Sequence, residues 1–140
     1  MIKEPDNVNP TPEINTSQAN GGPLTYDEES TKRKDELLKN RQPLSSPDQI
    51  TKEELIKTPN PLKITDMYKI EYLPSVDEFQ VELTTIRINT AKDDAVAWLK
   101  GQGFSDEALC KLPVVFTIDS QNAESLRGMN VIFNPLTPGC

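Results

Sequence analysis

The chain has 140 residues, which is room for one domain, and its apolar fraction of 35% is low for a globular protein. Its net charge of −7 is spread over both halves without a basic block, which argues against nucleic acid and anionic lipid as partners because both are bound through positive charge. No apolar run approaches the ~20 residues of a membrane-spanning helix and no signal peptide is recognised, so we expect contact with a membrane only through an anchor absent from this chain.

Residues 1–62 are predicted to form a long, disordered tether. Eight of the twelve prolines lie in this part, while the single Trp and all four Phe follow it. A polar segment with so few core-forming residues cannot bury enough surface to offset the entropy that is lost on ordering. The triplet Asn15-Thr16-Ser17 fits the glycosylation sequon, a short pattern that also arises often by chance.

Two helical patterns interrupt this tether. Residues 27–41 contain good helix formers, but only Leu37 and Leu38 are apolar, so we expect a transient helix without a face to dock. In the second pattern, Thr51 and Glu54 form a capping box, which predicts one or two helical turns at residues 52–57.

Residues 63–140 are predicted to form a small α+β domain, and its first part consists of two strands. Apolar residues alternate with polar ones in residues 68–72 and again in residues 78–83, which is typical of strands with one solvated face. The sequence "LPSVD" between them predicts a hairpin loop. Ile86 and Ile88 are out of step with Leu83, so either a bulge follows or the strand ends.

Helices and strands then alternate. A helix is expected at residues 91–100 with Thr90 as its cap, followed by a short helix capped by Ser105. The apolar run "LPVVFTI" predicts a strand covered on both faces, and a short helix ending at Gly128 precedes a final strand, "NVIF". The expected order is β-β-α-α-β-α-β, a small and mostly antiparallel sheet with helices on one face.

The predicted core combines the apolar faces of these elements. Trp98 could be a binding platform, but it shares a helical face with Ala91, Ala95 and Leu99, which favours a core position. The predicted core residues are Phe79, Val81, Leu83, Trp98, Leu99, Val114 and Phe116.

The chain has two cysteines, Cys110 and Cys140. They could be two reduced thiols, but metal ligation is disfavoured because the chain has no histidine to complete a zinc site, and no CxxC redox pair exists. An even count in a small, core-poor domain favours a disulfide, which for a loop of ~30 residues is worth roughly 3–4 kcal/mol. A disulfide in turn predicts an oxidising, extracytoplasmic compartment, such as a cell surface or a periplasm-like space.

Most catalytic chemistry lacks its usual residues. Without histidine the commonest acid/base group is missing, and no G-x-S-x-G, S-x-x-K, Walker or GxGxxG pattern occurs. The remaining carboxylates have structural explanations: Glu71 and Glu82 lie on solvated strand faces, and others lie in first helical turns, where they favour the helix dipole. We therefore predict no catalytic, cofactor-binding or metal-binding residue.

Two stretches, "AVAWLKGQGFSDEALCKLPVVF" and "LRGMNVIFNPLTPGC", resemble a group of small uncharacterised proteins of the candidate-phyla bacteria (Patescibacteria). The residues that carry the resemblance are Trp98-Leu99, Gln102-Gly103, Ser105, Glu107, Cys110 through Val114, Pro135 and Gly139-Cys140. The resemblance covers roughly residues 65–140. Because such proteins usually begin with a membrane anchor and a Pro/Thr-rich linker, it implies a tethered, extracytoplasmic domain and no assigned activity.

The predicted function is that of a non-enzymatic extracytoplasmic interaction module, presented on a flexible tether to an unknown protein partner. One alternative is a small-ligand binder or carboxylate-dependent enzyme, which needs a concave pocket with convergent polar groups. A second alternative is a structural subunit of a cell-surface assembly, which an open sheet edge would favour.

Overall fold

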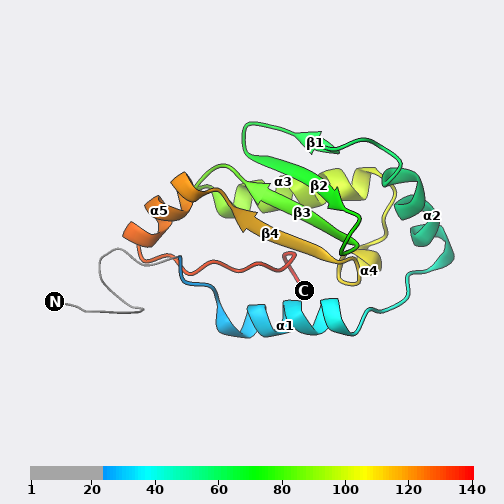
Figure 1. The fold of residues 1–140 in the computed structure, drawn as a ribbon, viewed down its shortest axis with the longest axis horizontal. Coiled ribbons are helices and arrows are strands. Elements are labelled where there is room, and N and C mark those ends of the chain that lie inside the picture. The colour runs from blue at the N-terminus through cyan, green and yellow to red at the C-terminus, as the bar shows by residue number, and fades with distance from the viewer. Residues whose placement is uncertain (1–23) are drawn as a thin grey trace.

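The protein forms a four-stranded sheet flanked by helices in the computed structural model, which describes residues 24–140 (Figure 1). The helices are α1 (Glu28–Lys39), α2 (Ser46–Leu55), α3 (Ile88–Gly101), α4 (Asp106–Leu109) and α5 (Ser120–Gly128). The strands are β1 (Lys63–Ile64), β2 (Tyr68–Leu73), β3 (Glu78–Leu83) and β4 (Val114–Ile118). This arrangement confirms the predicted α+β class.

The sheet has the strand order β1-β2-β3-β4 and is mostly antiparallel, as predicted. Strands β2 and β3 form the expected hairpin, in which Ile70 lies opposite Val81. Strand β4 pairs in parallel with β3, with Phe116 opposite Val81. This parallel pair is possible because α3 and α4 carry the chain across the sheet, as a parallel connection requires.

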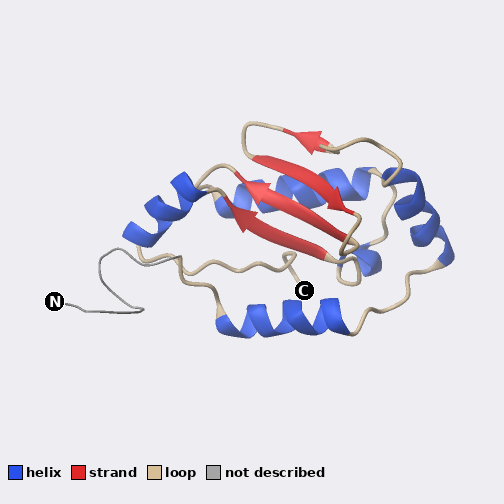
Figure 2. Ribbon diagram, viewed as in Figure 1, coloured by secondary structure: helices blue, strands red, loops and turns tan. Residues whose placement is uncertain are grey.

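One face of the sheet carries the core. Figure 2 shows α3 behind the strands, where its Ala91, Ala95 and Leu99 are fully buried. Alternate strand residues face the same layer and are buried: Tyr68, Ile70, Phe79, Val81, Leu83, Val114 and Phe116. Among residues 24–140, no helix lies over the opposite face of the sheet, and the side chains on that face are partly exposed.

The start of α3 differs from the prediction. Strand β3 ends at Leu83, and the helix begins at Ile88 rather than after Thr90. Arg87 occupies the cap position without a side-chain hydrogen bond. The helix extends further toward the N-terminus because Ile88 packs against the core, which explains why this residue is out of step with the preceding strand.

Trp98 lies beside the core rather than within it. It is partly buried and packs against the core cluster, whereas Ala95 and Leu99 on the same helix are fully buried. Successive helical residues are turned by about 100°, so a residue three positions after Ala95 lies at the border of the buried stripe. Trp98 is therefore a flank of the core.

The boundary expected at residue 62 also differs from the structure, because folded structure is present from residue 24. Leu24, Leu55 and Leu62 are buried in the same core as the sheet, and Leu44 packs against it. These apolar residues are too sparse to make a stripe, but each reaches the core singly: Leu55 ends α2, Leu62 directly precedes β1, and Leu24 and Leu44 lie in the segments that lead into α1 and α2. The expectations for residues 1–23, including the sequon at Asn15, lie outside the described residues.

Helix α2 begins earlier than predicted. Ser45 caps it by accepting a hydrogen bond from the backbone N–H of Asp48 at 3.3 Å. Pro47 is tolerated because it lies in the first turn, where its missing N–H would have no helical partner. Thr51, the expected cap, instead donates its hydroxyl to the carbonyl of Pro47 at 3.1 Å.

The C-terminal segment, residues 130–140, is extended but does not form the predicted final strand. Phe133 makes an isolated parallel bridge with Tyr26, and the backbone N–H of Phe116 donates to the carbonyl of Pro135 at 3.0 Å. The segment therefore lies along the outer edge of β4. It covers that edge and not the second face of the strand, where Val115 and Thr117 stay partly exposed. The prediction that this strand is covered on both faces is therefore wrong.

A disulfide closes this segment. Cys110, which ends α4, is bonded to Cys140, with the two Cα atoms 5.5 Å apart and 30 positions apart in sequence. The predicted bond is thus confirmed, and such bonds are typical of proteins that fold in an oxidising compartment. A backbone oxygen of Cys140 also accepts a hydrogen bond from Nη1 of Arg33 in α1 at 3.3 Å.

Candidate functional site

The carboxylates considered from sequence are not brought together. Glu82 lies on the uncovered sheet face, where it pairs with Lys69 at 3.8 Å. Asp93 and Asp94 are exposed on α3, and Asp106 pairs with Lys100 at 2.9 Å. Over residues 24–140, no group of three or more His, Cys, Asp or Glu residues could hold a metal ion.

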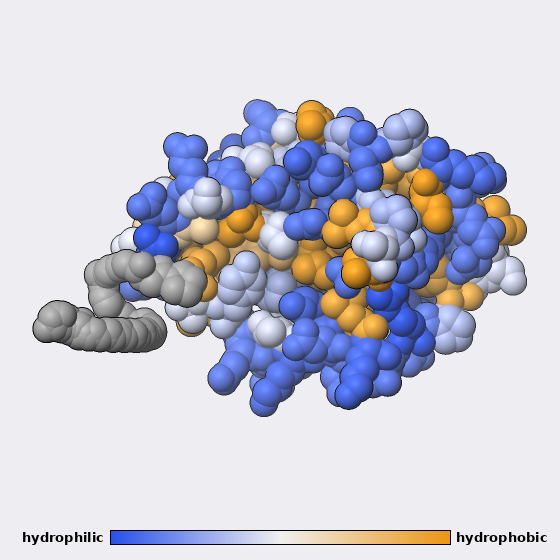
Figure 3. All heavy atoms as spheres, viewed as in Figure 1, coloured by the Kyte–Doolittle hydropathy of each residue, from blue (hydrophilic) through white to orange (hydrophobic). Residues whose placement is uncertain are grey.

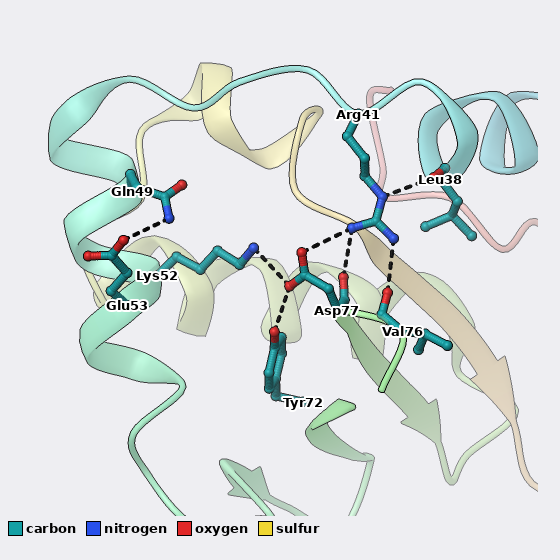
Figure 4. A network of polar contacts seen from close by, with 8 residues as sticks. All are labelled: Leu38, Arg41, Gln49, Lys52, Glu53, Tyr72, Val76 and Asp77. Carbon is teal, nitrogen blue, oxygen red and sulfur yellow. Dashed lines mark hydrogen bonds and ion pairs between the residues drawn. The ribbon is translucent and has the colours of Figure 1, made fainter. Parts of the chain in front are cut away.

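A different group of polar residues converges on Asp77, in the turn between β2 and β3 (Figure 4). One carboxylate oxygen, Oδ1, accepts from the Tyr72 hydroxyl at 2.6 Å and lies 2.9 Å from the Lys52 ammonium. The other, Oδ2, lies 3.2 Å from Nη1 of Arg41. We call Arg41, Lys52, Tyr72 and Asp77 the Asp77 cluster.

Local structure explains how the cluster is assembled. Asp77 has a φ of 52°, a left-handed conformation that aspartate tolerates better than most residues because its short side chain bonds locally. Lys52 is on α2, and Arg41 follows the end of α1. The cluster therefore joins the two N-terminal helices to the hairpin of the sheet.

Arg41 is also held by the backbone. Its guanidinium donates to the carbonyls of Leu38 at 3.0 Å, Asp77 at 2.9 Å and Val76 at 3.0 Å. Such a fork of donors fixes the orientation of the side chain. Arg41 thus links the end of α1 to the β2–β3 turn.

The cluster shifts the protonation of its own members. Partial burial raises the pKa of Asp77, but the Tyr72 hydroxyl, Lys52 and Arg41 outweigh it and hold the pKa below its ordinary value. Burial, together with the hydrogen bond to Asp77, raises the pKa of Tyr72 to about 12. The carboxylate is ionised and the phenol is protonated at neutral pH, so neither is suited to exchange protons there.

A small hollow of about 110 Å³ lies beside the cluster. We call it the Lys52 hollow, and its lining residues are Arg41, Gln42, Pro43, Leu44, Gln49, Lys52, Asp77, Lys111 and Pro113. Lys111 comes from the connection after α4 and pairs with Glu107 at 3.2 Å. The hollow thus contains three cations and one carboxylate from distant parts of the chain.

Asp48 is a second junction that sequence reasoning missed. It is only 4% exposed, and it accepts hydrogen bonds from the Ser105 backbone N–H at 2.9 Å and the Ser105 hydroxyl at 2.7 Å. The Ser45 hydroxyl donates to it at 2.8 Å. The caps of α2 and α4 therefore share this one carboxylate, a contact across 57 positions that no local pattern predicts.

Lys92 is a buried cation that helical spacing could have revealed, because it lies four positions before Val96 and seven before Leu99, on one face of α3. Its side chain lies among aromatic rings, with Nζ 4.9 Å from the centre of Phe116 and 5.7 Å from that of Phe133. Nζ donates to the carbonyl of Asn134 at 2.6 Å. Burial lowers the pKa of Lys92 to about 8, against the opposing effect of Asp93.

The surface of the described residues is mostly polar. Figure 3 shows hydrophilic residues over most of one face, with apolar residues gathered in smaller areas between them. The large apolar side chains that are exposed come from separate elements: Tyr26, Ile50, Ile64, Val76, Ile86, Met129 and Ile132. Among residues 24–140, no helix is both long enough and apolar enough to span a bilayer.

In comparisons with known proteins, no family model, no curated protein and no solved structure matches this chain. The resemblance to patescibacterial proteins therefore stays a prediction from sequence. The geometry defines a disulfide-closed α+β domain in which the clustered polar groups hold elements together.

Proposed function

We propose that the protein is a non-enzymatic, extracytoplasmic interaction module that binds a protein partner. The observation that carries the proposal is the uncovered face of the sheet. A sheet with one face free presents side chains at fixed spacing, and a surface that is already ordered loses little entropy on binding.

The side chains on that face are held across strands. Lys69 on β2 pairs with Glu82 on β3 at 3.8 Å, and the Gln80 amide donates to the Thr117 hydroxyl at 3.4 Å. Glu71 lies opposite Gln80 in the same register. Charged and amide groups arranged in this way favour a polar protein partner over a membrane or a nucleic acid.

The Cys110–Cys140 disulfide supports the extracytoplasmic part of the proposal. Structural disulfides persist where thiols are not kept reduced. We further propose that the protein is held at the cell surface by an anchor outside this chain, as the resemblance implies.

A photocrosslinking residue placed on the uncovered face tests the binding proposal. Glu71→p-benzoylphenylalanine should give a discrete crosslinked product in producing cells, because Glu71 lies on that face within β2, opposite Gln80 of β3. Glu124→p-benzoylphenylalanine is the matched control and should give none, since Glu124 is 75% exposed but lies on α5 and not on a strand of the sheet. Equal products from both positions, or none from Glu71, would contradict the proposal.

The location is tested separately by the state of the cysteines in the cell. Alkylation with a thiol reagent before lysis should leave both cysteines unmodified, and reduction should then expose two. Two thiols alkylated without reduction would refute the extracytoplasmic assignment whatever the crosslinking result.

A further inference from the structure

The Lys52 hollow contains more positive than negative charge, although the whole chain has a net charge of −7. Arg41, Lys52 and Lys111 line it with a single carboxylate, that of Asp77. An acidic protein has therefore concentrated cations from three separate elements at one concave place.

The one carboxylate is fully used by its neighbours. Oδ1 of Asp77 is shared by the Tyr72 hydroxyl and the Lys52 ammonium, and Oδ2 is taken by Arg41. It therefore cannot also neutralise Lys111. A carboxylate that two cations already share compensates only part of their combined charge.

Lys111 has weak compensation elsewhere. Its partner Glu107 is 73% exposed and lies four positions away, a type of surface pair that contributes little. Lys111 also helps to lower the pKa of Asp48, so that carboxylate, which is not part of the hollow's lining, balances some of the charge on Lys111. Neither carboxylate pairs with Lys111 inside the hollow, so part of its positive charge is left for another anion.

The cations are also shielded from solvent. The side chain of Lys52 is 13% exposed, that of Lys111 is 30% exposed and that of Arg41 is 35% exposed. Charges interact more strongly where water is partly excluded, so an added anion gains more here than at an open surface. Lys52 has three N–H donors and one carboxylate partner among the described residues.

We propose that the Lys52 hollow binds an oxyanion, and that this oxyanion is a carboxylate of the protein partner. The volume of about 110 Å³ is well below that of a pocket for a drug-sized ligand, and it suits a single carboxylate or phosphate group. The proposal rests on the proposed function only for the origin of the anion, because binding of a free oxyanion needs no partner.

Titrations followed by ¹H–¹⁵N correlation spectra test the site at constant ionic strength. Sodium acetate, sodium phosphate and a short glutamate-rich peptide are the three probes, and sodium chloride is the reference. We expect saturable shifts of the backbone amides of residues 41, 42, 44, 76, 77 and 111. Shifts that rise linearly and equally with chloride would overturn the proposal.

Variants localise the effect. Lys111→Gln should weaken acetate binding several-fold, and it leaves the Asp77 cluster intact. Lys100→Gln is the matched control, because Lys100 forms a similar surface pair with Asp106 outside the hollow. Lys52→Gln should abolish binding, provided that its spectrum stays dispersed. Acetate binding unchanged in Lys111→Gln would overturn the site.

The three probes also separate the sources of the anion. Peptide binding tighter than acetate binding supports a protein carboxylate, whereas binding of phosphate alone overturns the partner part of the proposal. Saturable binding of acetate together with failed crosslinking at Glu71 would leave the oxyanion site standing and refute the proposed partner face.

Discussion

Lys92 places an ammonium group beneath the C-terminal segment. Burial there disfavours the charged form of the lysine, whereas its contacts favour that form. Burial lowers the pKa of Lys92 from 10.5 to about 8, against the opposing effect of Asp93. The carbonyl of Asn134 and the rings of Phe116 and Phe133 contact the ammonium but do not replace the water that it loses. The position ties α3 to the segment that covers the edge of β4. The buried charge of Lys92 lowers the free energy of unfolding at neutral pH. Its hydrogen bond to Asn134 fixes the position of the C-terminal segment.

The free energy of unfolding should therefore rise with pH above 8. Between pH 8 and 10 the unfolded chain keeps its proton on Lys92 while the folded chain releases it, and stability increases wherever the unfolded state binds more protons. We expect a gain of about 2 kcal/mol between pH 7.5 and 9.5, and Lys92→Met should not show it. Denaturant unfolding at both pH values measures it, and an equal gain in Lys92→Met would contradict the assignment.

Asp48 gives the opposite pH dependence. Hydrogen bonds from the Ser105 backbone, the Ser105 hydroxyl and the Ser45 hydroxyl hold the pKa of Asp48 below its ordinary value. Its contribution to stability is present above the ordinary pKa of an aspartate and is lost as the pH falls through the lower, folded value.

Asp48→Asn should therefore be less stable than the parent at pH 6, because an amide is a poorer acceptor for three donors. The difference should shrink as the pH is lowered toward 3, where the parent carboxylate is also protonated. Thermal unfolding at several pH values measures the gap. Asp119→Asn is a control that affects only the cap of α5, where the carboxylate accepts from Asn122 alone. A gap for Asp48→Asn that is constant with pH would contradict the role.

At the scale of elements, α2 shows why sparse apolar residues can still be structural. Its Leu55 is 8% exposed and lies in the core cluster, while Ile50 on the same helix is 60% exposed. Helix α2 is also held by its cap at Ser45 and by Lys52 in the Asp77 cluster. The position of α2 in the fold thus depends on a few individual contacts rather than on a continuous apolar face.

Leu55→Ala should lower the free energy of unfolding by about 2–4 kcal/mol, as removal of a buried leucine side chain usually does. Ile50→Ala, the matched control on the same helix, should change it by less than about 0.5 kcal/mol, as exposed substitutions usually do. Denaturant unfolding compares the two. Equal, negligible effects would show that α2 does not belong to the folded unit.

At the scale of the whole molecule, the edge of β4 is closed by parts far apart in sequence. The C-terminal segment lies along β4 through Pro135, and residues 25–27 lie along that segment through the bridge of Tyr26 with Phe133. The rings of Tyr26 and Phe133 pack edge to face, with centroids 5.4 Å apart. The Cys110–Cys140 bond then secures the end of this layer.

Removing that bond should destabilise the protein without changing its fold. The double variant Cys110→Ser, Cys140→Ser should lose roughly 2–4 kcal/mol, because the unfolded chain regains the freedom of a loop of about 30 residues. Reduction of the parent should give the same loss, and reductant should not affect the variant. Unfolding curves with and without reductant measure this, and overlapping curves for the parent would contradict it.

The sequence alone determined the features that depend on neighbouring residues. The alternation in residues 68–72 and 78–83 identified the hairpin, and Ser105 marked the start of α4. Composition alone was enough to expect a bond between two cysteines in a domain with a modest core. These conclusions hold because strand periodicity and helix caps act over a few residues.

Only the tertiary structure decided where the chain's long-range polar partners meet. Nothing near Asp77 in sequence indicates that Arg41 and Lys52 lie beside it, and Asp48 meets Ser105 only because two helix starts come together. The segment from residue 24 was mistaken for a tether because its apolar residues form no stripe. Their burial depends on a core built from later residues, and local patterns contain no information about contacts of that kind.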